Sequence, residues 1–192
     1  MNRQSLKAIT SLLGKIEQNI VNGDHTNTTT MKYFALLSRY YYYGGTVSVE
    51  SRLSKSGILN TSNFNTHRAK QSYIDIAKLY TFGGQLKLRV SKALSDSKAD
   101  LFGIGTDNID KVVNKIRKFT ISNGVDLRYN KNTNVLCALN IETSQSISRK
   151  LDNWNNCNEL ENLIVNRVIE VYGHDYKYLE HNYYEYVRQM CV

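Results

Sequence analysis

The sequence contains no proline among its 192 residues. Average usage of about 5% predicts roughly ten prolines in a chain of this length. Asn and Tyr are plentiful instead, and the codons for Asn, Lys, Ile and Tyr are rich in A and T. The composition is typical of an AT-rich genome, as in many phages, and this indicates source rather than function.

Cysteine is scarce, and its spacing offers neither a disulfide framework nor a metal site. Cys137, Cys157 and Cys191 are odd in number and widely spaced, with no C-x-x-C motif, so we interpret them as reduced structural thiols. Among the histidines, His174 and His181 are seven residues apart and could share a helix face, but two weak ligands do not make a zinc site. The sequence predicts no metal and no cofactor.

Long hydrophobic runs are also absent, so no membrane span is predicted. The N-terminal segment has no continuous apolar region and no small-residue cleavage site, which predicts no signal peptide and an intracellular, cytoplasmic protein. Hydrophobic residues make up 41% of the chain and charged residues 22%, which is typical of a globular protein.

Signatures of catalysis are missing from the sequence as well. Gly103-Ile104-Gly105 precedes a predicted helix, but the third glycine of a dinucleotide fingerprint is absent, and no phosphate-binding G-x-x-x-x-G-K-[ST] motif occurs. No acidic pair, Ser-His-Asp order or Cys-His pair has a local context that marks a catalytic site. The sequence therefore favours a non-enzymatic protein and predicts no catalytic residues.

Positive charge is what the sequence does have, and it is unevenly distributed. Residues 50–131 carry fifteen Lys and Arg against seven Asp and Glu, a net charge of +8, whereas residues 132–192 carry five against eight, a net charge of −3. A strong basic bias of this kind is typical of a surface that meets a polyanion, most often nucleic acid.

Apolar spacing predicts a mostly helical α+β protein. We expect helices over 4–21, 31–43, 69–80, 84–96, 107–121, 158–172 and 175–190. Phe82-Gly83-Gly84 is expected to separate two of these helices, 46–50 alternates like a short strand, and 51–68 has the Ser, Asn and Thr content of a long loop.

The predicted domain organisation is a single compact domain with three regions. They are an N-terminal helical pair at 1–45, a basic central region at 46–141 and a C-terminal helical tail at 142–192. Ser and Thr cluster at 142–152, where the charge changes sign, so this stretch is the candidate for a domain break.

The segment 107–121 has the clearest helical pattern in the chain, and a β-hairpin is predicted directly after it at 125–141. Apolar residues from Ile109 to Phe119 form one stripe, and lysines lie on the opposite face. A basic helix followed by a hairpin resembles the recognition helix and wing of a winged-helix DNA-binding domain, which implies a helix in the major groove and a wing on the backbone. An ordinary amphipathic helix with a solvated lysine face remains the alternative.

The candidate nucleic-acid-binding residues follow from this resemblance and from the charge of the preceding helix. Tyr129 is included because an aromatic ring among basic residues can stack on an unpaired base, although core packing explains it equally well. The candidates are Lys87, Arg89, Lys92, Lys111, Lys115, Arg117, Lys118, Arg128, Tyr129 and Lys131.

Tyrosine is concentrated in two places, at Tyr40–Tyr43 and in the predicted C-terminal helix. Tyr40–Tyr43 are four consecutive tyrosines on a predicted helix, so they point in all directions and serve as core, as interface or as a stacking surface. The C-terminal helix carries more tyrosines than one apolar stripe needs, which indicates a dimer or protein-partner surface, with core packing and scattered surface tyrosines as the alternative. The candidate interface residues there are Tyr176, Tyr183, Tyr184 and Tyr186.

Three functional classes follow from these patterns. The first is a non-enzymatic nucleic-acid-binding protein, with DNA the expected partner and a regulatory or replication-associated role. The second is a protein-binding or structural component, such as a phage virion part or an inhibitor of a host enzyme, whose basic face docks on an acidic protein surface. The third is a small enzyme that processes nucleic acid, which requires an acidic metal cluster.

Overall fold

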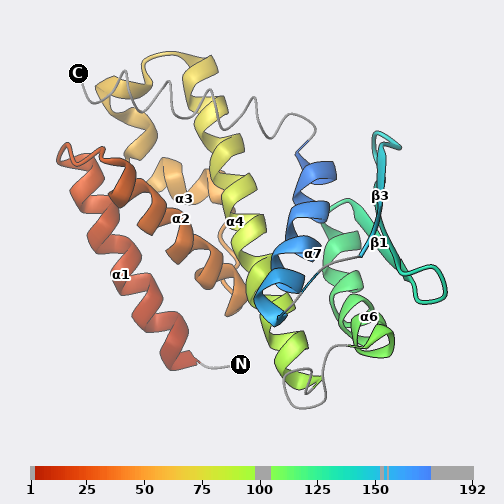
Figure 1. Ribbon diagram of the computed structural model, residues 1–192. Coiled ribbons are helices and arrows are strands. Elements are labelled where there is room, and N and C mark those ends of the chain that lie inside the picture. The colour runs from red at the N-terminus through yellow and green to blue at the C-terminus, as the bar shows by residue number, and fades with distance from the viewer. Residues whose placement is uncertain (1–2, 98–104, 152–153, 155, 174–192) are drawn as a thin grey trace. The chain divides into compact units, whose positions relative to one another are not determined.

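The structure is a computed structural model that describes residues 3–97, 105–151, 154 and 156–173 (Figure 1). These residues form six α-helices, two short 3-10 helices and one three-stranded antiparallel sheet. The prediction of a mostly helical α+β protein with a β-hairpin near 125–141 is confirmed.

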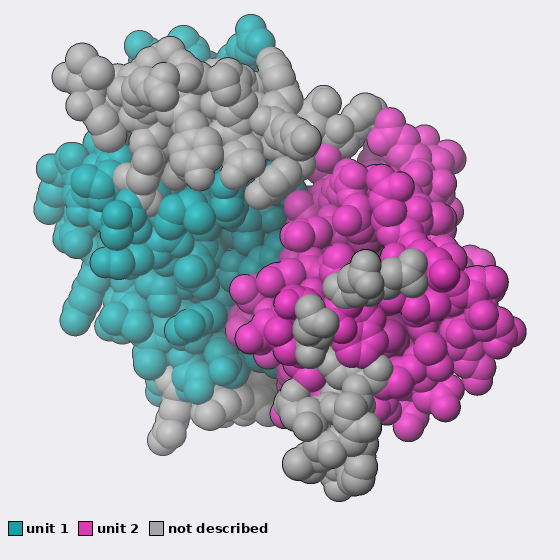
Figure 2. All heavy atoms as spheres, viewed as in Figure 1, with its two compact units in different colours: residues 1–85, 175–192 teal, residues 86–174 magenta. Residues whose placement is uncertain are grey.

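The chain divides into two compact units, which are coloured separately in Figure 2. Unit 1 comprises residues 1–85 and 175–192, and unit 2 comprises residues 86–174. The boundary falls inside helix α4 (His67–Asp96), and not at the segment 142–152 where the Ser and Thr content favours a break.

Unit 1 begins with two helices, α1 (Arg3–Val21) and α2 (Asn27–Tyr42), as the apolar spacing predicts. Helix α2 starts before the expected residue 31 because Thr26 is its N-cap. The Thr26 hydroxyl oxygen accepts a hydrogen bond from the Thr29 backbone N–H at 3.3 Å. The Thr30 side chain is buried and donates back to the Thr26 carbonyl oxygen.

The segment predicted as a long loop is folded and packed. It contains α3 (Val49–Lys55) and the 3-10 helices η1 (Ile58–Asn60) and η2 (Ser62–Phe64), and residues 46–48 form no strand. The many Ser and Thr residues act as caps and turns here; for example, the Ser48 hydroxyl accepts from the Ser51 backbone N–H at 3.1 Å. The loop prediction was wrong because the segment's few apolar residues follow no regular period, although Leu53, Ile58, Leu59 and Phe64 are all buried.

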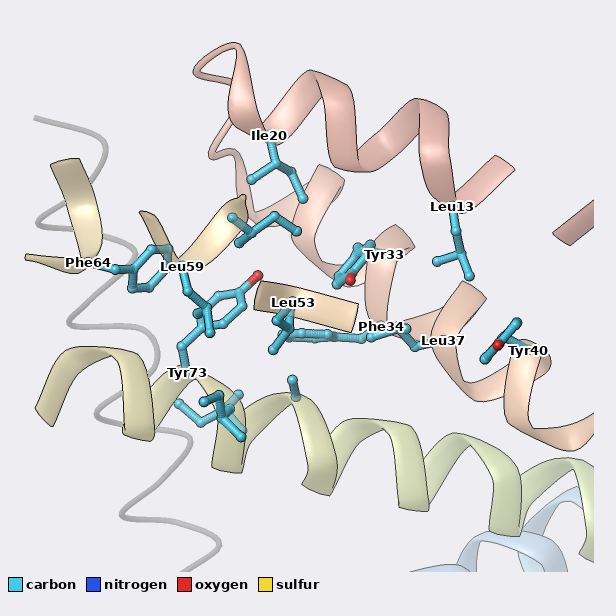
Figure 3. Packing of buried hydrophobic residues seen from close by; sticks show 14 of the residues in the cluster. Leu13, Ile20, Tyr33, Phe34, Leu37, Tyr40, Leu53, Leu59, Phe64 and Tyr73 are labelled. Carbon is cyan, nitrogen blue, oxygen red and sulfur yellow. The ribbon is translucent and has the colours of Figure 1, made fainter. Parts of the chain in front are cut away.

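The core of unit 1 gathers these apolar side chains between the helices (Figure 3). Leu13 and Ile20 of α1 lie on one side of it, and Tyr73 of α4 lies on the other. Phe34 of α2 packs at the centre, with its ring centroid 5.9 Å from that of Tyr73. Close packing of this kind, and not helix propensity, accounts for most of the stability of such short helices.

Helix α4 is one continuous helix of 30 residues, so the predicted break at Phe82-Gly83-Gly84 is wrong. Glycine weakens a helix interior by roughly 1 kcal/mol relative to alanine, yet here it serves packing. A Cβ atom on Gly84 would lie 2.3 Å from the Ser38 hydroxyl oxygen of α2. The glycine therefore marks a close approach of two helices and not a helix end.

Unit 2 contains α6 (Thr106–Ser122), the strands β1 (Val125–Asn130), β2 (Val135–Asn140) and β3 (Ser146–Lys150), and α7 (Cys157–Tyr172). The strands form an antiparallel meander in the order β1-β2-β3. Helices α6 and α7 cover one face of the sheet, where the buried residues are Val125, Leu127, Leu136 and Ala138.

Asparagine fixes both turns of the meander. The Asn130 side-chain oxygen accepts from the backbone N–H groups of Asn132 and Thr133, and Asn140 does the same at the second turn. The third strand was not predicted because its residues are mostly exposed and polar, so it shows no apolar alternation. Its pairing with β2 establishes it as a strand.

Helix α7 starts at Cys157, one residue before the expected start at 158, with Asn156 as its N-cap. The Asn140 side chain donates to the Val171 carbonyl oxygen at 2.8 Å, which ties the last turn of α7 to β2. The predicted helix 175–190 lies outside the described residues.

Candidate nucleic-acid interface

Helix α6 presents a ridge of three lysines on the side opposite its buried face. Ile109, Val112, Val113 and Ile116 are all buried in unit 2. Lys111, Lys115 and Lys118 are exposed, at the i, i+4 and i+7 spacing that aligns residues along one side of a helix. We call these three residues the α6 ridge; the predicted division of this helix into an apolar and a basic face is confirmed.

Lys115 of the α6 ridge and its neighbour Lys131 each form an ion pair with a carboxylate on a different secondary-structure element. Lys115 Nζ lies 3.6 Å from a carboxylate oxygen of Asp96, the last residue of α4. Lys131 Nζ, in the β1–β2 turn, lies 3.6 Å from Asp107 at the start of α6. All four side chains are about half exposed or more, so each pair contributes only about 0–1 kcal/mol and leaves its lysine available to a ligand.

Lys111 and Lys118 have no acidic partner among the residues that the structure describes. Lys92, which is exposed on α4, has none there either. It lies one turn from Arg89, whose guanidinium sits 4.3 Å from the Phe119 ring centroid of α6, and one turn from Asp96. Lys92 therefore borders the α6 ridge.

Arg117 and Arg128 share a single carboxylate. Arg117 Nε lies 3.0 Å from one oxygen of Asp126, and Arg128 contacts the other at 2.7 Å. Burial alone would raise the pKa of Asp126, but the hydrogen bonds from Arg117 and Arg128 outweigh burial and lower this pKa below its ordinary value. Two guanidinium groups on one carboxylate leave a net positive charge at the edge of β1.

Lys87 and Arg89 each contact another element of unit 2, although Lys87 is exposed and Arg89 is half-buried. Lys87 Nζ lies 3.7 Å from a carboxylate oxygen of Glu161, which is a buried residue of α7. Arg89 is half-buried over the Phe119 ring, an arrangement worth roughly 0.5–2 kcal/mol. Both contacts link α4 to its neighbours. Arg89 therefore has a structural role, whereas the pair of the exposed Lys87 contributes only about 0–1 kcal/mol and leaves this lysine available to a ligand.

Tyr129 also has a structural role in the hairpin. Its hydroxyl donates to the Asn134 side-chain oxygen at 2.7 Å, and the Asn134 amide donates in turn to the Leu151 carbonyl oxygen at 2.7 Å. The Tyr129 side chain is half-buried. This chain of hydrogen bonds closes the β1–β2 turn onto the end of β3.

The wing of the predicted winged helix corresponds to β1 and β2, but this hairpin is the first part of a three-stranded meander packed under two helices. The winged-helix interpretation therefore remains a prediction. The candidate interface residues Tyr176, Tyr183, Tyr184 and Tyr186 lie outside the described residues.

Sequence reasoning missed the acidic partners of the basic side chains. Asp126 and Arg128 are two residues apart on a strand, so their side chains share one face of the sheet. The two-residue period of a β-strand could therefore have predicted this pair from the sequence. The contacts of Asp96 with Lys115 and of Glu161 with Lys87 join distant parts of the chain and have no local signal.

The described residues also bear on metal sites and on membrane spans. They contain no group of three or more His, Cys, Asp or Glu side chains that could hold a metal ion. Within the same ranges, no helix combines the length and the apolar character needed to cross a membrane. Comparison of the chain with protein families, with curated proteins and with solved structures finds no match.

Proposed function

We propose that the protein binds nucleic acid through the α6 ridge, in a non-enzymatic regulatory or replication-associated role. The observation that carries this proposal is the alignment of Lys111, Lys115 and Lys118 on the exposed side of a helix whose other side is anchored in the core. A rigid support of this kind lowers the entropic cost of placing several cations together.

The expected mechanism is electrostatic capture of the phosphate backbone. Lys111 and Lys118 are seven residues apart, which corresponds to about 10 Å along the helix axis. Each strand of a DNA duplex carries one phosphate per 3.4 Å or so of its axis, so the α6 ridge spans about three nucleotides. Lys92 and Lys131 lie beside the ridge and extend the positive surface.

Phosphate contacts of this kind position a nucleic acid without reading its sequence. The proposal therefore predicts binding with little sequence preference, with DNA as the expected partner. Duplex DNA, single-stranded DNA and RNA of equal length distinguish the alternatives directly.

The test is a salt titration of the variant Lys111→Glu with Lys118→Glu. Two lost phosphate contacts should weaken duplex binding and reduce the slope of log K against log salt by about 1.8. Fluorescence anisotropy with a labelled duplex measures both quantities, and circular dichroism verifies folding, because both side chains are exposed.

The matched control is Lys55→Glu with Arg68→Glu, two exposed cations of unit 1 that give the same net charge. An equal loss of affinity in the two variants would mean that net charge alone matters and would remove the α6 ridge from the site. Tight binding of an acidic protein, with no salt-dependent binding of any nucleic acid, would favour the protein-docking alternative.

A further inference from the structure

When charges are counted by structural unit, residues 1–85 of unit 1 carry a larger net positive charge than unit 2, which contains α6. Residues 1–85 of unit 1 carry ten Lys and Arg against four Asp and Glu, a net charge of +6. Unit 2 carries thirteen against ten, a net charge of +3. The stronger excess therefore belongs to the helices of unit 1.

The four acidic side chains among residues 1–85 already have partners. Glu17 lies 2.9 Å from Arg52 Nε and also accepts from the Tyr33 hydroxyl. Glu50 pairs with Lys78. Asp24 accepts from Thr26 and Thr29 at the start of α2, and Asp75 accepts from Gln71 at 2.9 Å. The acids neutralise only two of the unit's cations.

Four of the remaining cations lie on the outward sides of α1 and α2. On α1, Lys7 and Lys15 are exposed on the side away from the buried residues Leu13 and Ile20. On α2, Lys32 and Arg39 are exposed at i and i+7, so they share one side of the helix. None of the four has an acidic partner in the part of the chain that the structure describes. We call Lys7, Lys15, Lys32 and Arg39 the α1–α2 face.

The two helices are joined by a short turn and run antiparallel side by side (Figure 1). The Tyr33 hydroxyl donates to a Glu17 carboxylate oxygen at 3.2 Å, which places the last third of α1 beside the first half of α2. Neither helix carries an exposed acidic side chain, because α2 has no Asp or Glu and Glu17 is turned toward Arg52. A phosphate chain that contacts this face meets no repulsive carboxylate from either helix.

The four consecutive tyrosines at the end of α2 differ in their environment. Tyr40 is buried, and the Tyr41 hydroxyl donates to the Val47 carbonyl oxygen at 2.5 Å. Tyr42 and Tyr43 are half-buried, with ring centroids 5.2 Å apart and edge to face, and Tyr43 packs against the core of unit 1. They directly follow the turn that carries Arg39, and aromatic rings beside cations are typical of surfaces that hold single strands.

We propose that the α1–α2 face is a second nucleic-acid-binding surface, which contacts the phosphate backbone through Lys7, Lys15, Lys32 and Arg39. The half-buried ring of Tyr42, one turn from Arg39, leads us to expect a preference for single strands over duplexes. This inference rests on the proposed nucleic-acid binding, but it assigns a share of the affinity to a different unit and a different set of residues.

The experiment uses the full chain and the variant Lys32→Glu with Arg39→Glu. On a labelled single-stranded oligonucleotide the affinity should fall at least tenfold at low salt, and the slope of log K against log salt should shrink by about 1.4, which corresponds to two lost phosphates. Lys32→Gln with Arg39→Gln, which adds no acidic group, should reduce the slope equally. Circular dichroism and thermal melting verify that both variants are folded.

Two comparisons separate this inference from the proposed function. The inference is overturned if the α2 variant matches the control Lys55→Glu with Arg68→Glu while the Lys111→Glu, Lys118→Glu variant loses affinity. If the α2 variant alone loses affinity, the α1–α2 face stands and the α6 ridge fails. Salt-independent or absent binding of every nucleic acid by the wild type contradicts both.

Discussion

Asp126 limits the positive charge available on unit 2. Its carboxylate pairs with both Arg117 and Arg128, and its side chain is only 12% exposed. A nucleic acid therefore competes with this carboxylate for the two guanidinium groups. Pairs of this kind tie up cations that the sequence alone counts as available.

Replacement of Asp126 by Asn should release Arg117 and Arg128 from their shared carboxylate. We expect nucleic-acid affinity to increase and the salt dependence to become steeper, because up to two more cations then reach phosphates. Anisotropy titrations of wild type and variant at several salt concentrations measure the change. An unchanged salt slope would place both arginines outside the interface.

The same carboxylate should contribute to acid sensitivity. The pKa of Asp126 in the folded protein lies below its ordinary value of 3.8, so the ionised form stabilises the fold above that pH. This stabilisation is lost as the pH falls below about 4 and through the folded pKa. Urea unfolding should therefore show wild type more stable than Asp126→Asn at pH 7, with the difference narrowing toward about pH 3.

Ile116 tests whether the buried side of α6 is correctly assigned. Its side chain is 2% exposed, so Ile116→Ala should cost roughly 2–5 kcal/mol of unfolding free energy. Ile121, on the same helix, is 41% exposed, and Ile121→Ala should stay within about 0.5 kcal/mol. Chemical denaturation of both variants decides the matter, and equal costs would contradict the assignment.

Among the helices, α4 shows how tertiary packing overrides a local signal. A glycine pair usually indicates a helix end, but Gly84 lies where α2 comes too close for any side chain. Gly14 of α1 is the opposite case, since a Cβ atom there would meet nothing within 4 Å. The same residue type therefore has a packing role in one helix and none in the other.

This contrast predicts opposite effects for the same substitution. Gly84→Ala should destabilise the protein, because the new Cβ atom overlaps Ser38, whereas Gly14→Ala should stabilise it by about 0.4–1 kcal/mol through lower unfolded-state entropy. Thermal melts of the two variants measure the effects. Stabilisation by both would show that α2 and α4 can move apart without cost.

For the molecule as a whole, the expectation is two basic surfaces on one chain. Two surfaces that engage the same strand act together through their effective concentration, without any new contact. The affinity for a long oligonucleotide should then exceed the affinity for a short one by more than the larger number of binding positions on the long strand explains.

This length dependence is the prediction for the complete chain. Wild type should bind a strand of about 40 nucleotides at least tenfold more tightly than one of about 10, after correction for the number of sites; linked sites gain roughly 10²–10⁴-fold when both engage fully. Variants of either the α6 ridge or the α1–α2 face should lose the excess. If the excess persists in both variants, the two surfaces do not act together.

The sequence by itself determined the features that depend on local order. The periodicity of α1 and α6, the alternation of β1 and β2 and the lysines of the α6 ridge all follow from residues close together in the chain. Helix and strand geometry convert such spacing directly into faces, so the spacing alone predicts these elements and the ridge.

Tertiary structure decided everything that depends on distant residues. It packed the apolar residues of 51–68, carried α4 through Gly84 and paired the polar strand β3 with β2. It also determined which cations meet carboxylates, because Coulomb interactions depend on separation in space and not along the chain. A charge count by segment pointed to residues 50–131, with a net charge of +8, whereas a count by folded unit gives +6 for residues 1–85 and +3 for residues 86–174.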